Sequence, residues 1–271
     1  MTTMLKRQMA PITAEAWAEI DEQAASVLRG NLSGRKVADL DGPHDITFAA
    51  VNLGGVEPAA KEAAKGVQWG TRKVLPLIEI RVPFALGIWD LDDISRGSKT
   101  AELKPVVEAA EKAAGFEEQA IYNGFKPGGI EGVVATAENK AIALPAAADA
   151  YPKAVEDAVH AIQSNGIGGP YNLVLGRVPY QKLSVGDQKG YPLRRRIEDM
   201  LGGGGIHWSP ALKGGVLLSG RGGDFELTLG QDLSIGYQRQ QDNDVELYIT
   251  ESFTFRVLEP AAAVELKAAA K

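Results

Sequence analysis

The sequence contains no cysteine and only three histidines, His44, His160 and His207, in a chain of 271 residues. Without cysteine the chain forms no disulfide, no thiolate metal site and no cysteine nucleophile. The histidines are widely spaced, and the sequence has no G-x-S-x-G, H-E-x-x-H or G-x-x-x-x-G-K-[ST] motif. These absences argue against the common hydrolase, metalloprotease and nucleotide-hydrolysing classes.

The sequence also has no stretch of about 20 apolar residues, the length that a membrane helix needs. Lys6 and Arg7 lie near the start, but no apolar run follows them, so this segment is unlike a secretory signal. The formal net charge of −6 gives no general attraction to nucleic acid or to an anionic membrane. We therefore expect a protein of the cytoplasm that has neither nucleic acid nor a membrane as a partner.

Apolar periodicity predicts two long helices in the first half of the chain. The first helix opens at Pro11 and Thr13 and closes at Gly30, and the second runs over 105–124. A strand is expected over 75–86, where apolar and charged residues alternate. The stretch 45–70 has little periodicity, and a loop of this length is unusual inside a compact domain. We interpret it as an arm that reaches another subunit.

The second half of the sequence is mixed and ends in strands. A helix is expected from Pro152 to 165–166, with short strands at 171–175 and 215–219. Strict alternation over 245–257 predicts a strand of roughly 45 Å, longer than a small core requires. The tail AAAVELKAAAK has a helix-forming composition, and the sequence assigns it no role.

Two groups of residues are candidate binding sites on chemical grounds. The acidic cluster WDLDD at 89–93 is either a cation site or a solvated turn after a strand, and we favour the turn. Arg81, Trp89 and Tyr191 are residue types that pair with a phosphate and stack on a flat ring. The alternative for Trp89 is a contact between subunits.

Several segments, taken together and in order, resemble the encapsulin family, the linocin- or bacteriocin-like shell proteins of family 1. The similarity spans 5–257, nearly the whole chain. The segments that carry it are LKRQMAPITAEAWAEID, LSGRKVADLDGP, WGTRKVLPLIEIR, LDDISRG, FEEQAIYNG, IEG, GPYNLVL, RGGDFELTLGQDLSIGY and ITESFTFRV.

The resemblance implies an α+β fold of the tailed-phage major capsid protein type (Hong Kong 97 phage type). Its expected parts are an N-terminal helix and arm at 1–44, an extended loop at 45–80, a peripheral domain at 81–136 and 223–271, and an axial domain at 137–222. The implied function is that of a self-assembling shell subunit, with about 60 copies closing an icosahedral compartment around cargo enzymes. A phage-type capsid protein is the alternative. A bacteriocin or protease function is less favoured, because the sequence contains no catalytic motif.

The resemblance also assigns residues to the binding of the cargo's C-terminal peptide. Arg35 and Asp39 would orient this peptide, and Leu233 and Ile235 would hold its apolar anchors. The cargo would be a ferritin-like protein or a dye-decolorizing peroxidase. The alternative for Leu233 and Ile235 is a place in the core of a strand.

Two further expectations follow from the resemblance. Some encapsulins bind a flavin (FMN) on the shell, and here Arg81, Trp89 and Tyr191 would hold it. Asp187 and Lys189 would edge a pore at the five-fold vertices. The family implies no catalytic residue, no metal ligand and no required cofactor.

Overall fold

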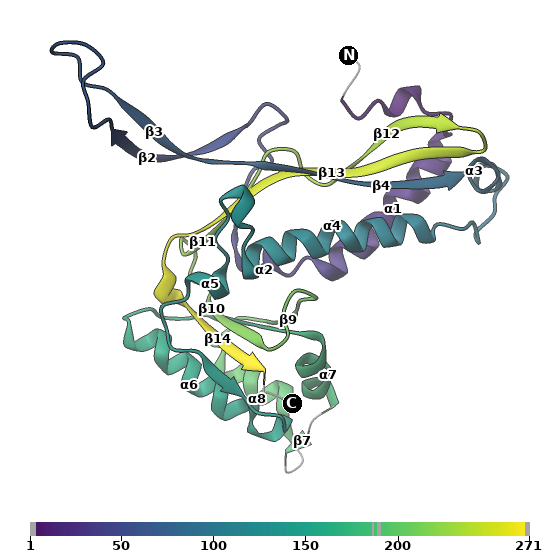
Figure 1. Ribbon diagram of the computed structural model, residues 1–271. Helices are drawn as coiled ribbons and strands as arrows, with labels where there is room; N and C mark the ends of the chain where they lie inside the picture. The colour runs from purple at the N-terminus through teal and green to yellow at the C-terminus, as the bar shows by residue number, and fades with distance from the viewer. Residues whose placement is uncertain (1–3, 186, 189–190, 269–271) are drawn as a thin grey trace.

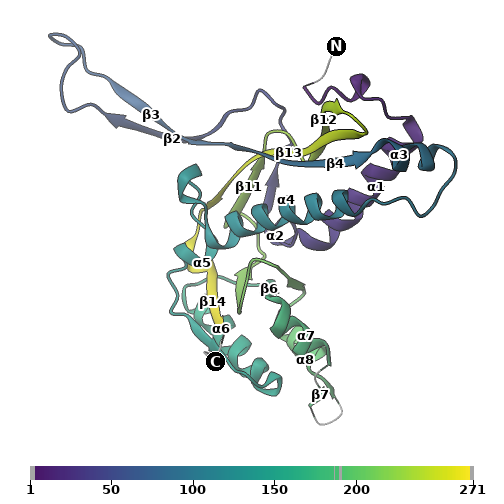
Figure 2. The same cartoon turned by 45° about the vertical axis from the view of Figure 1, so that its right-hand side comes forward.

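The computed structural model describes residues 4–185, 187–188 and 191–268, and these form three parts (Figures 1 and 2). An elongated unit holds the first sheet and the two longest helices. A compact unit holds the second sheet, and a two-stranded arm, the hairpin arm, projects from the elongated unit. The chain passes from one unit to the other three times, because segments of both sheets alternate along the sequence.

The first sheet is organised around the long strand β13, as the alternation over 245–257 predicts. Strand β4 pairs with its first part, up to Phe253, and β11 pairs with the rest. The odd-numbered residues from Val245 to Phe255 are all buried, and Tyr248, Thr250 and Thr254 on the opposite face are buried as well, so much of this strand is covered on both faces. The strands of the first sheet are β1 (Asp39–Asp41), β4 (Ile78–Gly87), β11 (Phe225–Leu229), β12 (Ser234–Gln241) and β13 (Asp244–Val257).

The two long helices lie side by side along this sheet (Figure 1). The hydroxyl of Thr13 caps the first by accepting a hydrogen bond from the N–H of Ala16 at 3.2 Å. Pro105 stands in the first turn of the second, and Gly124, at a positive φ, ends it. Both predicted helices are confirmed. The helices of the elongated unit are α1 (Ala14–Asn31), α2 (Gly34–Val37), α3 (Ile88–Ser95), α4 (Lys104–Asn123) and α5 (Val133–Thr136).

The hairpin arm consists of β2 (Ala50–Pro58) and β3 (Gly70–Pro76), paired antiparallel. The expected strand over 75–86 is therefore two strands, which separate at Leu77, where the N–H donates to the carbonyl of Ala49 at 2.9 Å. Part of 45–70, the segment Ala50–Pro58, is regular strand although its sequence is not periodic, because most of its side chains on both faces are exposed. Its exposed apolar side chains are Leu53, Val56, Val67, Trp69 and Val74.

The compact unit has strand order β5-β14-β10-β6-β9, and it confirms the strands expected at 171–175 and 215–219. The prediction assigned 223–271 to the peripheral domain, but β14 lies in this second sheet, between β5 and β10. This alanine-rich segment forms a strand and not a helix, because pairing in the second sheet buries Val264 and Leu266. The strands are β5 (Ile142–Leu144), β6 (Tyr171–Leu175), β9 (Ile206–Trp208), β10 (Gly215–Ser219) and β14 (Ala263–Ala268).

Among the described residues, three α-helices and a small two-stranded sheet complete the compact unit. Figure 2 shows this small sheet at its far end, away from the elongated unit. The elements are α6 (Tyr151–Ser164), α7 (Arg177–Val185), β7 (Asp187–Gln188), β8 (Tyr191–Pro192) and α8 (Leu193–Met200).

The acidic cluster WDLDD lies in helix α3, where the sequence predicted a turn after a strand. Leu91 and Ile94 are buried on one side of this helix, and this amphipathic spacing explains the difference. Across the described ranges, no group of three or more His, Cys, Asp and Glu side chains is placed to hold a metal ion. No helix in the same ranges is both long enough and apolar enough to cross a membrane.

Candidate functional site

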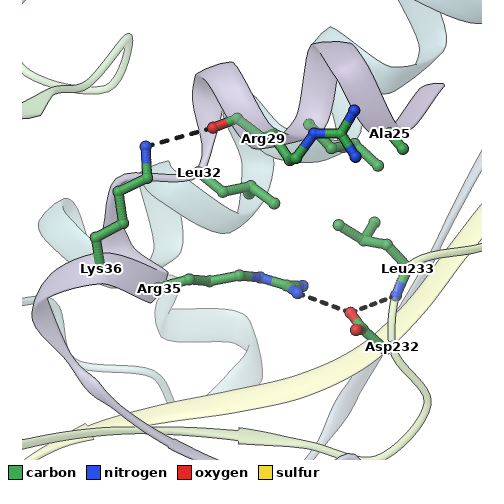
Figure 3. Close-up of a pocket in the computed structure, with 8 residues that line it drawn as sticks. Ala25, Arg29, Leu32, Arg35, Lys36, Asp232 and Leu233 are labelled. Atoms are coloured by element: carbon green, nitrogen blue, oxygen red, sulfur yellow. Dashed lines mark hydrogen bonds and ion pairs between the residues drawn. The ribbon is translucent and has the colours of Figure 1, made fainter. Parts of the chain in front are cut away.

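A pocket of about 550 Å³ lies between the C-terminal half of α1, helix α2 and the loop that joins β11 to β12 (Figure 3). This volume is in the range of pockets that hold small ligands or side chains. One wall is aliphatic, and charged groups lie at its edge and floor. The lining residues are Ala25, Leu28, Arg29, Leu32, Arg35, Lys36, Asp232 and Leu233.

Arg35 forms the floor of the pocket and binds three carboxylates. Its Nε and Nη2 donate to Glu117 at 2.7–3.1 Å, Nη2 also donates to Glu251 at 2.6 Å, and Nη1 donates to Asp232 at 2.8 Å. Asp232 Oδ1 also accepts the N–H of Leu233 at 2.7 Å. Arg35 therefore holds the loop that carries Leu233, and its Nε, Nη1 and Nη2 groups each donate to a carboxylate of the same subunit.

The two glutamates beneath Arg35 are fully buried, with 0% of each side chain exposed. Burial raises the pKa of Glu251 well above its usual value, and the nearby charge of Glu117 raises it further. Oε2 of Glu251 is buried and has no hydrogen-bond partner among the described residues. A proton on Glu251 relieves the excess of negative charge that three ionised acids would place around one guanidinium.

The four residues predicted to bind a peptide lie in different places. Arg35 and Leu233 line the pocket, whereas Ile235 is 6% exposed and belongs to the core between the first sheet, α1 and α4. Asp39 lies outside the pocket and accepts a hydrogen bond from the N–H of Gly223 at 2.6 Å. The structure thus brings together two of the four.

The three residues predicted to hold a flavin are not adjacent within one subunit. The guanidinium of Arg81, in β4, lies 4.8 Å from the ring centre of Tyr248 and pairs with Glu79. Trp89, in α3, is 71% exposed and follows Arg81 by eight positions, most of them extended, a separation of roughly 20 Å. Tyr191 lies in β8 of the compact unit, and its side chain is outside the described residues.

The two predicted pore residues fall where little is described. The backbone of Asp187 pairs with Pro192 in the small sheet of the compact unit, and its side chain is outside the described part. Lys189 lies outside the described residues altogether. Both remain predictions.

The buried acids are the functional residues that the sequence analysis missed, although periodicity points to them. Glu251 has the same parity as Ile249 and Phe253, which are buried in β13. Glu117 follows the buried Ala113 by one helical turn in α4. An acid in an apolar stripe needs a cation as partner, and this rule would have led to Arg35.

A third buried acid, Glu118, joins the two units. It accepts hydrogen bonds from Ser33 Oγ at 2.5 Å, the N–H of Gly34 at 2.7 Å and Ser209 Oγ at 2.6 Å. Ser209 follows β9 of the compact unit, whereas Ser33 and Gly34 belong to the elongated unit. Burial raises the pKa of Glu118 to about 6, although these hydrogen bonds oppose the shift.

Comparison with known proteins gives consistent matches over nearly the whole chain. The family model described as "Encapsulating protein for peroxidase" matches residues 1–254. A type 1 encapsulin shell protein of Rhodococcus erythropolis is 41% identical over 264 residues, which cover 97% of this chain and 99% of that protein.

Solved structures of shells and capsids share the fold. A virus-like particle from Pyrococcus furiosus matches with a TM-score of 0.67 at 16% identity and covers 94% of this chain and 100% of its own. The capsid of the myovirus XM1 matches with a TM-score of 0.54 at 10% identity, covering 88% and 92%. At these identities the likeness is one of fold, and it confirms the phage capsid type expected from the sequence.

Proposed function

Because the chain belongs to the encapsulin family of shell proteins, we propose that it closes an icosahedral compartment and takes up cargo by binding a C-terminal peptide in the pocket beside α1. Its curated relatives are shell proteins, so the chain is a shell subunit that forms a capsid-like homo-oligomer and is not an enzyme. The proposal goes further in four respects: about 60 copies, a place in the cytoplasm, cargo, and the residues that bind it.

The pocket supports the cargo proposal because it combines an aliphatic wall with charged groups at fixed positions. Leu28, Leu32 and Leu233 offer apolar surface to a peptide side chain, and burial of such surface supplies affinity. The floor is rigid, since Arg35 is bound by two buried glutamates. A peptide would therefore meet a preformed site, which lowers the ordering cost of binding. The family description names a peroxidase, and a ferritin-like protein is the other expected cargo.

Replacement of Leu233 by Asp should abolish loading while the shell still closes. A carboxylate on the apolar wall would be desolvated by the peptide, and we expect at least about a ten-fold loss of loading. The measurement is the fluorescence of purified shells co-expressed with a fluorescent protein that carries the C-terminal tail of a dye-decolorizing peroxidase. Leu258→Asp, at an exposed leucine outside the pocket, is the matched control. Full loading of Leu233→Asp shells would contradict the proposal.

We also propose that the shell binds a flavin. The exposed side chain of Trp89 supports this proposal, because its indole would stack on the isoalloxazine ring. Since Arg81 lies far along the strand, a site that holds both residues would need a neighbouring subunit. Shells purified after growth with added flavin should absorb in the flavin bands, and Trp89→Ala shells should not. Equal absorbance in both, or none in either, would end this proposal.

A further inference from the structure

Two cations at the edge of the pocket have no acidic partner among the residues that the structure describes. These are Arg29 and Lys36, which Figure 3 shows beside the aliphatic wall. Lys36 Nζ donates to the carbonyl oxygen of Arg29 at 3.3 Å, at the end of α1. Both residues are exposed. They differ from Arg35 below them, whose guanidinium binds three carboxylates.

Helix capping explains only part of this arrangement. Cations near the C-terminus of a helix stabilise its last carbonyl groups, and Lys36 does this for α1. An ammonium has three N–H donors and one of them is used here, while the guanidinium of Arg29 has five. In a chain of net charge −6, this edge is a local site of positive charge with donors to spare.

The pocket thus places an aliphatic wall next to two unpaired cations. A ligand that fits both has an apolar side chain and a carboxylate on the same residue or on adjacent ones. The last residue of a polypeptide meets this requirement whenever its side chain is apolar, because the α-carboxylate is attached to the same Cα.

We propose that the pocket recognises the end of the cargo chain itself, with the terminal α-carboxylate held at the positively charged edge that Arg29 and Lys36 form and the aliphatic wall holding an apolar side chain beside it. Figure 3 shows the charged groups of Arg29 and Lys36 pointing apart, so one of them binds the carboxylate directly and the other adds to its attraction. Charge-assisted hydrogen bonds to a carboxylate are strong and directional, so they fix the register of the peptide. This inference rests on the proposed cargo function and adds the chemistry that the pocket selects.

The test uses three fluorescein-labelled peptides and purified empty shells. The shells are either disassembled into subunits before the peptide is added, or disassembled and reassembled in the presence of the peptide. The first is Gly-Ser-Gly-Ser-Leu-Leu with a free terminal carboxylate, and the second is the same peptide with a terminal amide. The third carries Leu-Leu-Asp inside a peptide that ends in Gly-Ser amide. Fluorescence anisotropy should give about ten-fold tighter binding for the free acid than for the other two.

Variants of the shell assign the effect to the two cations. Lys36→Gln and Arg29→Gln should weaken binding of the free acid and leave binding of the amide unchanged. Lys112→Gln replaces an exposed lysine of α4 outside the pocket and should change neither. Added salt should weaken binding of the free acid alone.

The outcomes separate this inference from the proposed function. If acid and amide bind equally and Leu233→Asp abolishes both, recognition of the chain end is wrong and the pocket stays the docking site. Tight binding of the peptide with the internal Asp would mean that the pocket recognises an acidic segment and not a chain end, and it would overturn the inference. If no peptide binds, or if Leu233→Asp has no effect on binding, the pocket proposal itself fails.

Discussion

At the scale of residues, buried carboxylates set the chemistry of the elongated unit. Glu117 and Glu251 lie under Arg35, and Glu118 points the other way toward the compact unit. A buried charge is costly unless it is paired or hydrogen-bonded, so each acid needs a cation, several hydrogen-bond donors or a proton. The two clusters therefore make the stability of the subunit depend on pH.

Glu118 should reduce the stability of the fold as pH rises. Its pKa is about 6 when folded and 4.5 when it is free of the fold, so the folded state binds the proton more tightly. The stabilisation is complete below pH 4.5 and is lost as pH rises through about 6, an effect of about 2 kcal/mol. The free energy of unfolding of Glu118→Gln, relative to the unmutated protein, should rise by this amount between pH 4.5 and 7. The matched control is Glu111→Gln, at an exposed glutamate of the same helix. A constant difference would contradict the assignment.

At the scale of elements, prediction from sequence succeeds where burial and periodicity agree. The apolar run of β6 and the alternation of β13 each favour a strand, and both strands lie where they were expected. The hairpin arm was recognised as an arm but not as two paired strands, because an exposed hairpin has no apolar period. The sequence also could not show that Ile235 and Leu233, two residues apart in β12 and the loop before it, face the core and the pocket respectively.

Strand β14 was missed because its alanines favour a helix, and only the second sheet makes it a strand. Leu266 is fully buried between β5 and β10, so Leu266→Ala should destabilise the compact unit by about 2–5 kcal/mol. Glu265→Ala, on the more exposed side of the same strand, is the control. Chemical denaturation of both variants measures the difference. A surface helix at this position would give a small effect for each of them.

At the scale of the whole molecule, the exposed apolar residues of the hairpin arm indicate a surface that is covered in the assembly. Five large apolar side chains are exposed on an arm that projects from the subunit (Figure 1). Isolated subunits rarely expose so much apolar surface on one element unless it binds a partner. The capsid-like assembly of the family supplies that partner as another copy of the chain.

The chain expressed alone should assemble into uniform hollow spheres, visible by electron microscopy after size exclusion. Deletion of the tip of the hairpin arm, residues 59–69, should prevent closure and leave the circular dichroism of the subunit close to that of the intact chain. A small oligomer formed by the intact chain would argue against assembly without cargo. Spheres formed by the deletion variant would show that the tip is dispensable.

The three passages of the chain between the two units also restrict how such a gene can recombine. The elongated unit is built from segments before β5 and after β10, and the compact unit is completed only by β14. A single crossover between two diverged shell genes, anywhere from β1 to β14, joins strands from different parents within one sheet. Neither unit can therefore be inherited as a cassette, and viable chimeras require parents whose cores already match.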